Sequence, residues 1–212
     1  MSRYLILFTF IVKTGAYANF SELGPYDVEV LYGDTSLSED VSMQYTLYKP
    51  FNAPEVPHIM LSHGFLDDQS SMTGFANHYA SWGIKVVTMN LLHSSLISND
   101  PFQDAEDLIG LSNQIGGENA VIYVGHSSGG MRSIIGATED SSALAVLGLD
   151  LVDGSFGDDF LALENVSNLS VPVWGLLGES SSCNSYGNGL DVYNNALNGN
   201  AVRITEADHC DF

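Results

Sequence analysis

The strongest constraint on the fold is the pentapeptide Gly125-His126-Ser127-Ser128-Gly129, which directly follows the apolar run at 121–124. The residues after it favour a helix, so the pattern predicts a strand, a tight turn and a helix in succession. The flanking glycines let the strand and the helix approach closely, and the turn exposes the hydroxyl of Ser127. We therefore interpret Ser127 as a nucleophile. The alternatives are a purely structural turn, or Ser128, which lacks the flanking glycines.

Short apolar runs alternate with helical stretches along the rest of the chain, and no repeat or linker divides it. Strands separated by helices imply parallel crossovers, and two early runs that alternate apolar and polar residues indicate antiparallel strands. The sequence predicts one three-layer α/β/α domain over 19–212, with a mostly parallel central sheet, antiparallel N-terminal strands and no large lid. The expected strands are 27–32, 43–48, 59–61, 84–89, 120–124, 143–149, 171–177 and 201–205, and the expected helices are 70–82, 101–115, a stretch from 127 onward, and 190–197.

A serine nucleophile needs a histidine base, and the chain order on this kind of sheet is serine, acid, histidine. Only His209 follows both Ser127 and the last expected strand, so we predict that it is the base. His126 is expected to pack beside the turn. The remaining histidines precede the nucleophile and are expected to be structural, namely His58, His63, His78 and His93.

Three carboxylates are candidates for the acid that orients the histidine. Asp150 ranks first, because it follows the expected strand 143–149 and so lies at the carboxyl edge of the sheet, beside Ser127. Glu179 ranks second, since it is the only acidic residue directly after the next strand. Asp153 ranks third.

Backbone N–H groups are the expected donors to the oxyanion of an acyl-transfer reaction. One belongs to Ser128, at the start of the helix after the nucleophile. The other belongs to Phe65, because the loop Ser62-His63-Gly64-Phe65 follows an early buried strand, where such enzymes carry their second donor. An ordinary turn is the alternative for that loop. This chemistry implies no metal and no organic cofactor.

The first 18 residues have the order of a secretory signal peptide, with Arg3 near the start, an apolar run at 4–12 and Ala16-Tyr17-Ala18 at its end. We predict cleavage after Ala18 and a secreted or periplasmic protein that does not insert into membranes; a buried N-terminal strand is the alternative. The formal net charge of −20 argues against nucleic acid or anionic lipid as a partner. We expect a monomer with a solvated acidic surface.

The two cysteines are Cys183 and Cys210. An oxidising compartment favours their pairing, so we predict a disulfide between them, with two free buried thiols as the alternative. Their spacing does not suggest a zinc site.

Taken together, the motifs resemble the α/β-hydrolase superfamily over nearly all of 19–212. The resemblance depends on His63-Gly64-Phe65, Gly125-His126-Ser127-Ser128-Gly129-Gly130 and the late His209. Within the superfamily, the chain looks like the group of bacterial polyester hydrolases (cutinase-like enzymes), dienelactone-hydrolase-like proteins and chlorophyllases. The resemblance to polyester hydrolases implies that Phe65 contacts substrate and that a Cys183–Cys210 bridge ties the acid loop to the histidine loop.

The groups that the chain resembles differ in the position of the acid. Polyester hydrolases carry an aspartate near the position of Ser181, whereas chlorophyllases have a segment similar to Asp150-Leu151-Val152-Asp153-Gly154 after the preceding strand. The similarity to chlorophyllases therefore implies Asp150. The chain also ends three residues after His209, where relatives continue into a C-terminal helix, so a truncated reading frame is one expectation.

The sequence therefore predicts a serine hydrolase that cleaves small-molecule or polymeric carboxylic esters through an acyl-enzyme on Ser127. Hydrolysis of another acyl bond, such as an amide, thioester or lactone, is an alternative because the same triad chemistry serves all of them. A non-catalytic binding protein on a hydrolase scaffold is a further hypothesis.

Overall fold

The structure is a computed structural model of the chain. It describes residues 19–37, 42–54, 57–116, 120–154 and 160–212. The predicted signal peptide, at 1–18, lies outside the described residues. Within the described ranges, no helix is long and apolar enough to cross a lipid bilayer.

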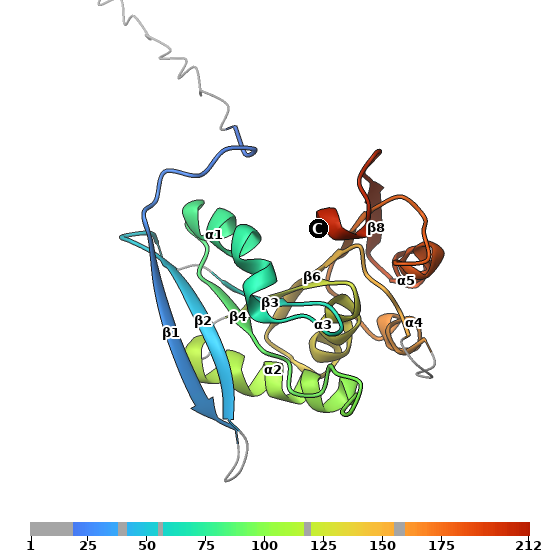
Figure 1. The fold of residues 1–212 in the computed structure, drawn as a ribbon, viewed down its shortest axis with the longest axis horizontal. Helices are drawn as coiled ribbons and strands as arrows, with labels where there is room; N and C mark the ends of the chain where they lie inside the picture. Colours follow the sequence, from blue (N-terminus) through green and yellow to red (C-terminus); the bar gives the residue numbers. More distant parts are fainter. Residues whose placement is uncertain (1–18, 38–41, 55–56, 117–119, 155–159) are drawn as a thin grey trace, which may run out of the picture.

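Eight strands form one sheet in the order β1-β2-β4-β3-β5-β6-β7-β8 (Figure 1). β1 and β2 form an antiparallel ribbon at one edge, and β2 also pairs antiparallel with β4, whereas all other neighbours are parallel. This confirms the predicted mostly parallel sheet with an antiparallel start. The strands are β1 (Val28–Ser36), β2 (Ser42–Pro50), β3 (His58–Ser62), β4 (Val86–Met89), β5 (Val121–His126), β6 (Ala143–Leu149), β7 (Val173–Leu177) and β8 (Gly199–Arg203).

Helices cover both faces of this sheet (Figure 1). Ile59 and Leu61 of β3 point to the face that α1 covers, and Phe212 contacts the same apolar cluster. Met60 points to the opposite face, as the two-residue period of a strand requires, and there it meets the core that α2, α3, α4 and α5 cover. The helices are α1 (Thr73–Ser81), α2 (Pro101–Gly116), α3 (Ser128–Glu139), α4 (Leu161–Val166) and α5 (Gly189–Asn195), with short 3₁₀ turns η1 (Gln69–Met72), η2 (Ser185–Gly187) and η3 (His209–Asp211).

The predicted elements are present, with boundaries shifted by a few residues, but α4 was not predicted. This helix has only six residues, and its first N–H groups are satisfied from outside the helix. Asp153 accepts hydrogen bonds at 2.8 Å from the N–H groups of both Ala162 and Leu163. A cap supplied from this far upstream leaves no local start signal in the sequence.

The largest buried polar side chain is Arg132 in α3, whose Nε lies 2.6 Å from Oδ2 of Asp104 in α2. Both side chains are fully buried. The guanidinium also donates to the carbonyl of His93 at 3.0 Å and to Oδ1 of Asn99 at 2.9 Å. Arg132 therefore holds the segment after β4 against both helices.

We expect Arg132→Met to lower the free energy of unfolding by about 3–5 kcal/mol, because it leaves the carboxylate of Asp104 buried without its cation. Urea unfolding followed by circular dichroism measures this loss. The double variant Arg132→Met with Asp104→Leu has no unpaired buried charge, so it should regain most of the lost stability. A single variant as stable as the parent would contradict this role for the ion pair.

His58, the first residue of β3, is fully buried, and its Nε2 lies 2.8 Å from Oγ of Ser112. Burial and the nearby charge of Lys85 lower the pKa of His58 to about 4. The ordinary pKa of about 6.5 applies to the unfolded chain, so the unfolded state takes up a proton first as the pH falls. The stability that neutral His58 contributes is therefore present above about pH 6.5 and is lost on acidification toward pH 4.

The expected loss through His58 is about 3 kcal/mol by pH 4. Urea unfolding of the parent and of His58→Phe across this pH range isolates the effect, since the variant cannot titrate at this position. We expect the parent to lose about 3 kcal/mol more than the variant on acidification. Parallel stability curves for the two proteins would show that His58 does not cause the loss.

Candidate active site

Ser127 lies at the tight turn between β5 and α3, as predicted. Its backbone has φ 54° and ψ −126°, a conformation that is strained for a residue with a side chain. The flanking glycines have no room for a side chain: a Cβ on Gly125 would lie 2.3 Å from the carbonyl carbon of Gly129, and one on Gly129 would lie 2.3 Å from the carbonyl oxygen of His63. Close packing of the turn thus requires the Gly-x-Ser-x-Gly pattern.

The structure brings together Ser127, His209 and Asp150, three of the predicted site residues. Nε2 of His209 lies 3.0 Å from Oγ of Ser127, and Nδ1 of His209 lies 2.7 Å from Oδ2 of Asp150. Asp150 is almost fully buried, whereas Ser127 and His209 are half-buried and remain accessible from the surface. We call these three hydrogen-bonded side chains the relay. Each is within hydrogen-bond reach of the next, which is the geometry that a nucleophile and its base require.

Asp150 is held as a carboxylate by its surroundings. Burial works to raise its pKa, but hydrogen bonds from His209, the N–H of Gly178 and the amide of Asn184 outweigh burial and leave the pKa below its ordinary value. The last two bonds measure 2.9 and 3.0 Å. Asp150 also has a positive φ of 43° directly after β6, which turns its side chain toward His209. A carboxylate fixed in this way can set the tautomer of the histidine.

The other two acid candidates lie elsewhere. Asp153 caps α4, as described above. Glu179 is exposed, and its Oε1 accepts from the N–H of Glu206 at 3.4 Å. Of the three ranked carboxylates, the structure therefore brings Asp150 to His209.

The predicted oxyanion loop lies against the nucleophile. A Cβ on Gly64 would lie 3.2 Å from Cβ of Ser127, so the Gly64–Phe65 peptide is beside the turn. Ser128 is the first residue of α3, where backbone N–H groups and the helix dipole favour negative charge. The two predicted donor residues thus flank Ser127 from different elements.

The ring of His63 fixes the orientation of the Gly64–Phe65 peptide, a role that the sequence did not reveal. Its Nδ1 donates to the carbonyl of Gly64 at 2.7 Å, and its Nε2 accepts from the N–H of Leu91 at 3.0 Å. Burial lowers the pKa of His63 and so favours this neutral form. The carbonyl and N–H of a trans peptide point in opposite directions, so a bond to the Gly64 carbonyl also aims the N–H of Phe65.

His126 connects the nucleophile turn to the histidine loop, and this contact was also not foreseen. Its Nε2 donates to the backbone carbonyl of His209 at 3.0 Å, and the two ring centroids lie 4.7 Å apart. Burial, followed by electrostatic repulsion from the nearby His209, lowers the pKa of His126 and so favours its neutral form. The packing predicted for His126 is present, and a positioning contact comes with it.

We expect His126→Leu to lower kcat by about tenfold with little change in KM, since one hydrogen bond that positions His209 is lost. His126→Gln is the matched variant, because its amide N–H can donate to the same carbonyl, and it should recover most of the activity. Steady-state kinetics on one ester substrate checks both. Equal kcat values for the leucine variant and the parent would remove His126 from this role.

The predicted disulfide is absent from the structure. Cys183 and Cys210 are both free thiols, and both are exposed, so each faces solvent. Two hydrogen bonds tie the two loops together instead: the N–H of Glu179 donates to the carbonyl of Ala207 at 2.7 Å, and the N–H of Glu206 donates to Oε1 of Glu179 at 3.4 Å. Within the described ranges, no group of three or more histidine, cysteine or acidic side chains is arranged to hold a metal ion.

Comparison with known proteins gives matches among solved structures. No protein-family model and no curated protein sequence matches the chain. A dienelactone hydrolase from Anabaena variabilis is 18% identical, with a TM-score of 0.71 over 86% of this chain and 88% of its own. A candidate dienelactone hydrolase from Klebsiella pneumoniae is 16% identical, with a TM-score of 0.69 over 85% and 88%.

A membrane phospholipase A, described as a bacterial virulence factor, is 12% identical, with a TM-score of 0.69 over 85% of this chain and 80% of its own. These neighbours share the sheet and its flanking helices rather than a close sequence. The likeness extends over most of each molecule, and it includes the dienelactone-hydrolase-like group that the motifs resemble. The chain therefore has the α/β-hydrolase fold that its resemblance to that superfamily implied.

Proposed function

We propose that the protein is a serine hydrolase that cleaves carboxylic esters in two steps. The observation that carries the proposal is the relay of Ser127, His209 and Asp150, with successive distances of 3.0 and 2.7 Å, at the carboxyl edge of an α/β-hydrolase sheet. Oγ of Ser127 attacks the acyl carbon while His209 takes its proton, and Asp150 stabilises the imidazolium that forms.

The backbone N–H groups of Phe65 and Ser128 supply the oxyanion hole in this proposal. The tetrahedral intermediate then collapses, the bond to the alcohol oxygen breaks, and His209 returns its proton to that oxygen. A water molecule attacks the acyl-enzyme by the same route and releases the acid. The position of the Gly64–Phe65 peptide beside Ser127 supports this assignment.

Substrate turnover tests the reaction class. The structural neighbours are named for hydrolysis of a dienelactone and of a phospholipid, which favours esters and lactones over amides. We expect turnover of p-nitrophenyl acetate, p-nitrophenyl butyrate and dihydrocoumarin, and no measurable turnover of p-nitroacetanilide. Folded protein that is inert on all four would favour a binding protein on a hydrolase scaffold.

We further propose that residues 1–18 direct export and are removed, which would make the protein secreted or periplasmic. The order of charge, apolar run and small residues supports this. Mass spectrometry of the protein exported by a bacterial host would show an N-terminus at Asn19, whereas retention of 1–18 would contradict it.

A further inference from the structure

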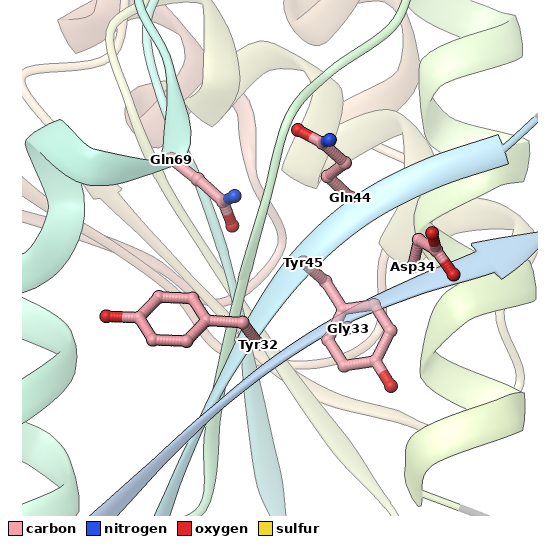
Figure 2. A pocket seen from close by; sticks show the side chains of 6 residues that line it. All are labelled: Tyr32, Gly33, Asp34, Gln44, Tyr45 and Gln69. Carbon is pink, nitrogen blue, oxygen red and sulfur yellow. The ribbon is translucent and has the colours of Figure 1, made fainter.

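A groove runs along the β1–β2 ribbon, away from the triad. Two cavities of about 450 and 290 Å³ lie in it and share Tyr32 and Gln69 as lining residues. Figure 2 shows the larger cavity, with side chains from β1, β2 and the start of η1 around it. Since the two cavities share lining residues, they are adjacent, and together they make up the groove.

Three cross-strand pairs form the floor of this groove. Val30 pairs with Tyr48, Tyr32 with Thr46, and Asp34 with Gln44, and alternate residues of a strand point to the same face. The pairs at the two ends are four residues apart along β1, which corresponds to a length of about 13 Å. The opposite wall comes from η1 and the first turns of α1, with Gln69, Ser70, Thr73 and Asn77.

One end of the groove lies at the carboxyl ends of the parallel strands, where the triad also lies. Asn90 directly follows β4, and its side chain accepts from the N–H of Gln69 at 3.0 Å and donates to Oε1 of Gln44 at 3.3 Å. β2 is three strand spacings from β5, about 14 Å. Gln69 also lies only four residues beyond Phe65 in the chain. A substrate longer than about 14 Å could therefore reach from Ser127 into the groove.

The lining is almost uncharged, although the chain has a formal net charge of −20. Among the described residues that line the two cavities, Asp34 is the one acidic residue and none is basic; most of the others offer hydroxyl or carboxamide groups. Such groups both donate and accept hydrogen bonds, as the hydroxyls of a sugar do. Tyr32 is 84% exposed as a residue, and its ring offers a flat apolar surface to the C–H face of a sugar ring.

We infer that this groove binds the carbohydrate part of the ester substrate, a neutral acylated oligo- or polysaccharide whose acyl group lies at Ser127. The inference rests on the proposed function. A fatty acyl chain fits the lining poorly, since Val30 is its only aliphatic side chain among the described residues, and an anion would be repelled by the acidic chain. In the reaction, the acyl C–O bond to the sugar breaks, and the sugar hydroxyl leaves with the proton from His209.

Binding of unacylated sugars tests the groove separately from catalysis. Calorimetric titration of the full-length protein with xylohexaose, cellohexaose and mannohexaose should give binding of at least one, weakened about tenfold by Tyr32→Ala. Phe51→Ala is the matched control, because Phe51 is an exposed aromatic residue at the other end of the ribbon, 62% exposed. Three results would overturn the inference: no binding of any of the three sugars, an equal loss of sugar affinity in both variants, or tighter binding of the cation choline than of the sugars.

Kinetics then connects the groove to the triad. Acetylated xylo-oligosaccharide and p-nitrophenyl acetate deliver the same acyl group, so only the alcohol part differs. We expect the ratio of their kcat/KM values to fall about tenfold in Tyr32→Ala and to stay unchanged in Phe51→Ala. A parent protein that binds the sugar but hydrolyses neither ester would refute the proposed function and leave the groove in place, whereas an unchanged ratio in Tyr32→Ala would refute the groove.

Discussion

Ser127→Ala is expected to lower kcat for p-nitrophenyl acetate by about 10⁵-fold, to a residual rate that the oxyanion hole and substrate binding alone supply. The expected loss is large because Oγ of Ser127 is the atom that attacks. Among the described residues, it is also the side-chain atom that is hydrogen-bonded to Nε2 of His209, at 3.0 Å. The measurement is initial-rate kinetics with the protein at high concentration. Unchanged unfolding midpoints would show that the fold is preserved.

Ser128→Ala is the matched control for this experiment. It removes the neighbouring hydroxyl but keeps the backbone N–H that serves the proposed oxyanion hole, so kcat should stay within about threefold of the parent. The Ser128 side chain is buried at the start of α3, and its hydroxyl makes no hydrogen bond to any described residue. Full activity of Ser127→Ala would contradict Ser127 as the nucleophile. A comparable loss in Ser128→Ala would show that the loss is not specific to the Ser127 hydroxyl.

Asp150→Asn is expected to lower kcat by about 10⁴-fold at neutral pH. The amide leaves the geometry nearly intact, but it can donate to Nδ1 of His209 and so favours the tautomer that cannot accept the proton of Ser127. The 2.7 Å bond between Nδ1 and the carboxylate makes this outcome specific to Asp150. Steady-state kinetics measures it, with unfolding curves to confirm that the variant is folded.

The same change from carboxylate to amide at the other acid candidates provides the controls. Glu179→Gln should keep kcat within about twofold, because Glu179 is exposed and lies outside the relay. Asp153→Asn should lower stability by about 1 kcal/mol through the weakened cap of α4, with a smaller effect on kcat. A loss in Glu179→Gln as large as that in Asp150→Asn would contradict the assignment of the acid.

The sequence was enough to predict the sheet and the relay, for identifiable physical reasons. Strand ends, glycines and residue order are local signals. Ser127 follows a buried strand and has a glycine two residues away on each side, Asp150 follows the next strand, and His209 comes after the last one. Parallel strands bring their carboxyl ends to one edge of the sheet, so three residues far apart in the chain meet there. The relay is thus a consequence of topology, which the sequence pattern determines.

The supporting contacts could not be predicted, because each depends on how separate loops pack. The bond from Asn184 to Asp150 spans 34 residues, and the bond from His126 to the His209 carbonyl spans 83. No local pattern distinguishes these side chains from ordinary polar residues. The same limit explains why the predicted disulfide was wrong. An oxidising compartment favours pairing of Cys183 and Cys210, but it does not determine whether their side chains face each other.

The identity of the nucleophile is tested most directly by the site at which a fluorophosphonate modifies the protein, because this reagent reacts with an activated serine hydroxyl. Peptide mass spectrometry should find one phosphonyl group per chain, on Ser127, and His209→Ala should slow the labelling strongly because the serine loses its base. Modification of Ser128 or of another residue, or no modification of folded protein, would contradict Ser127 as the nucleophile.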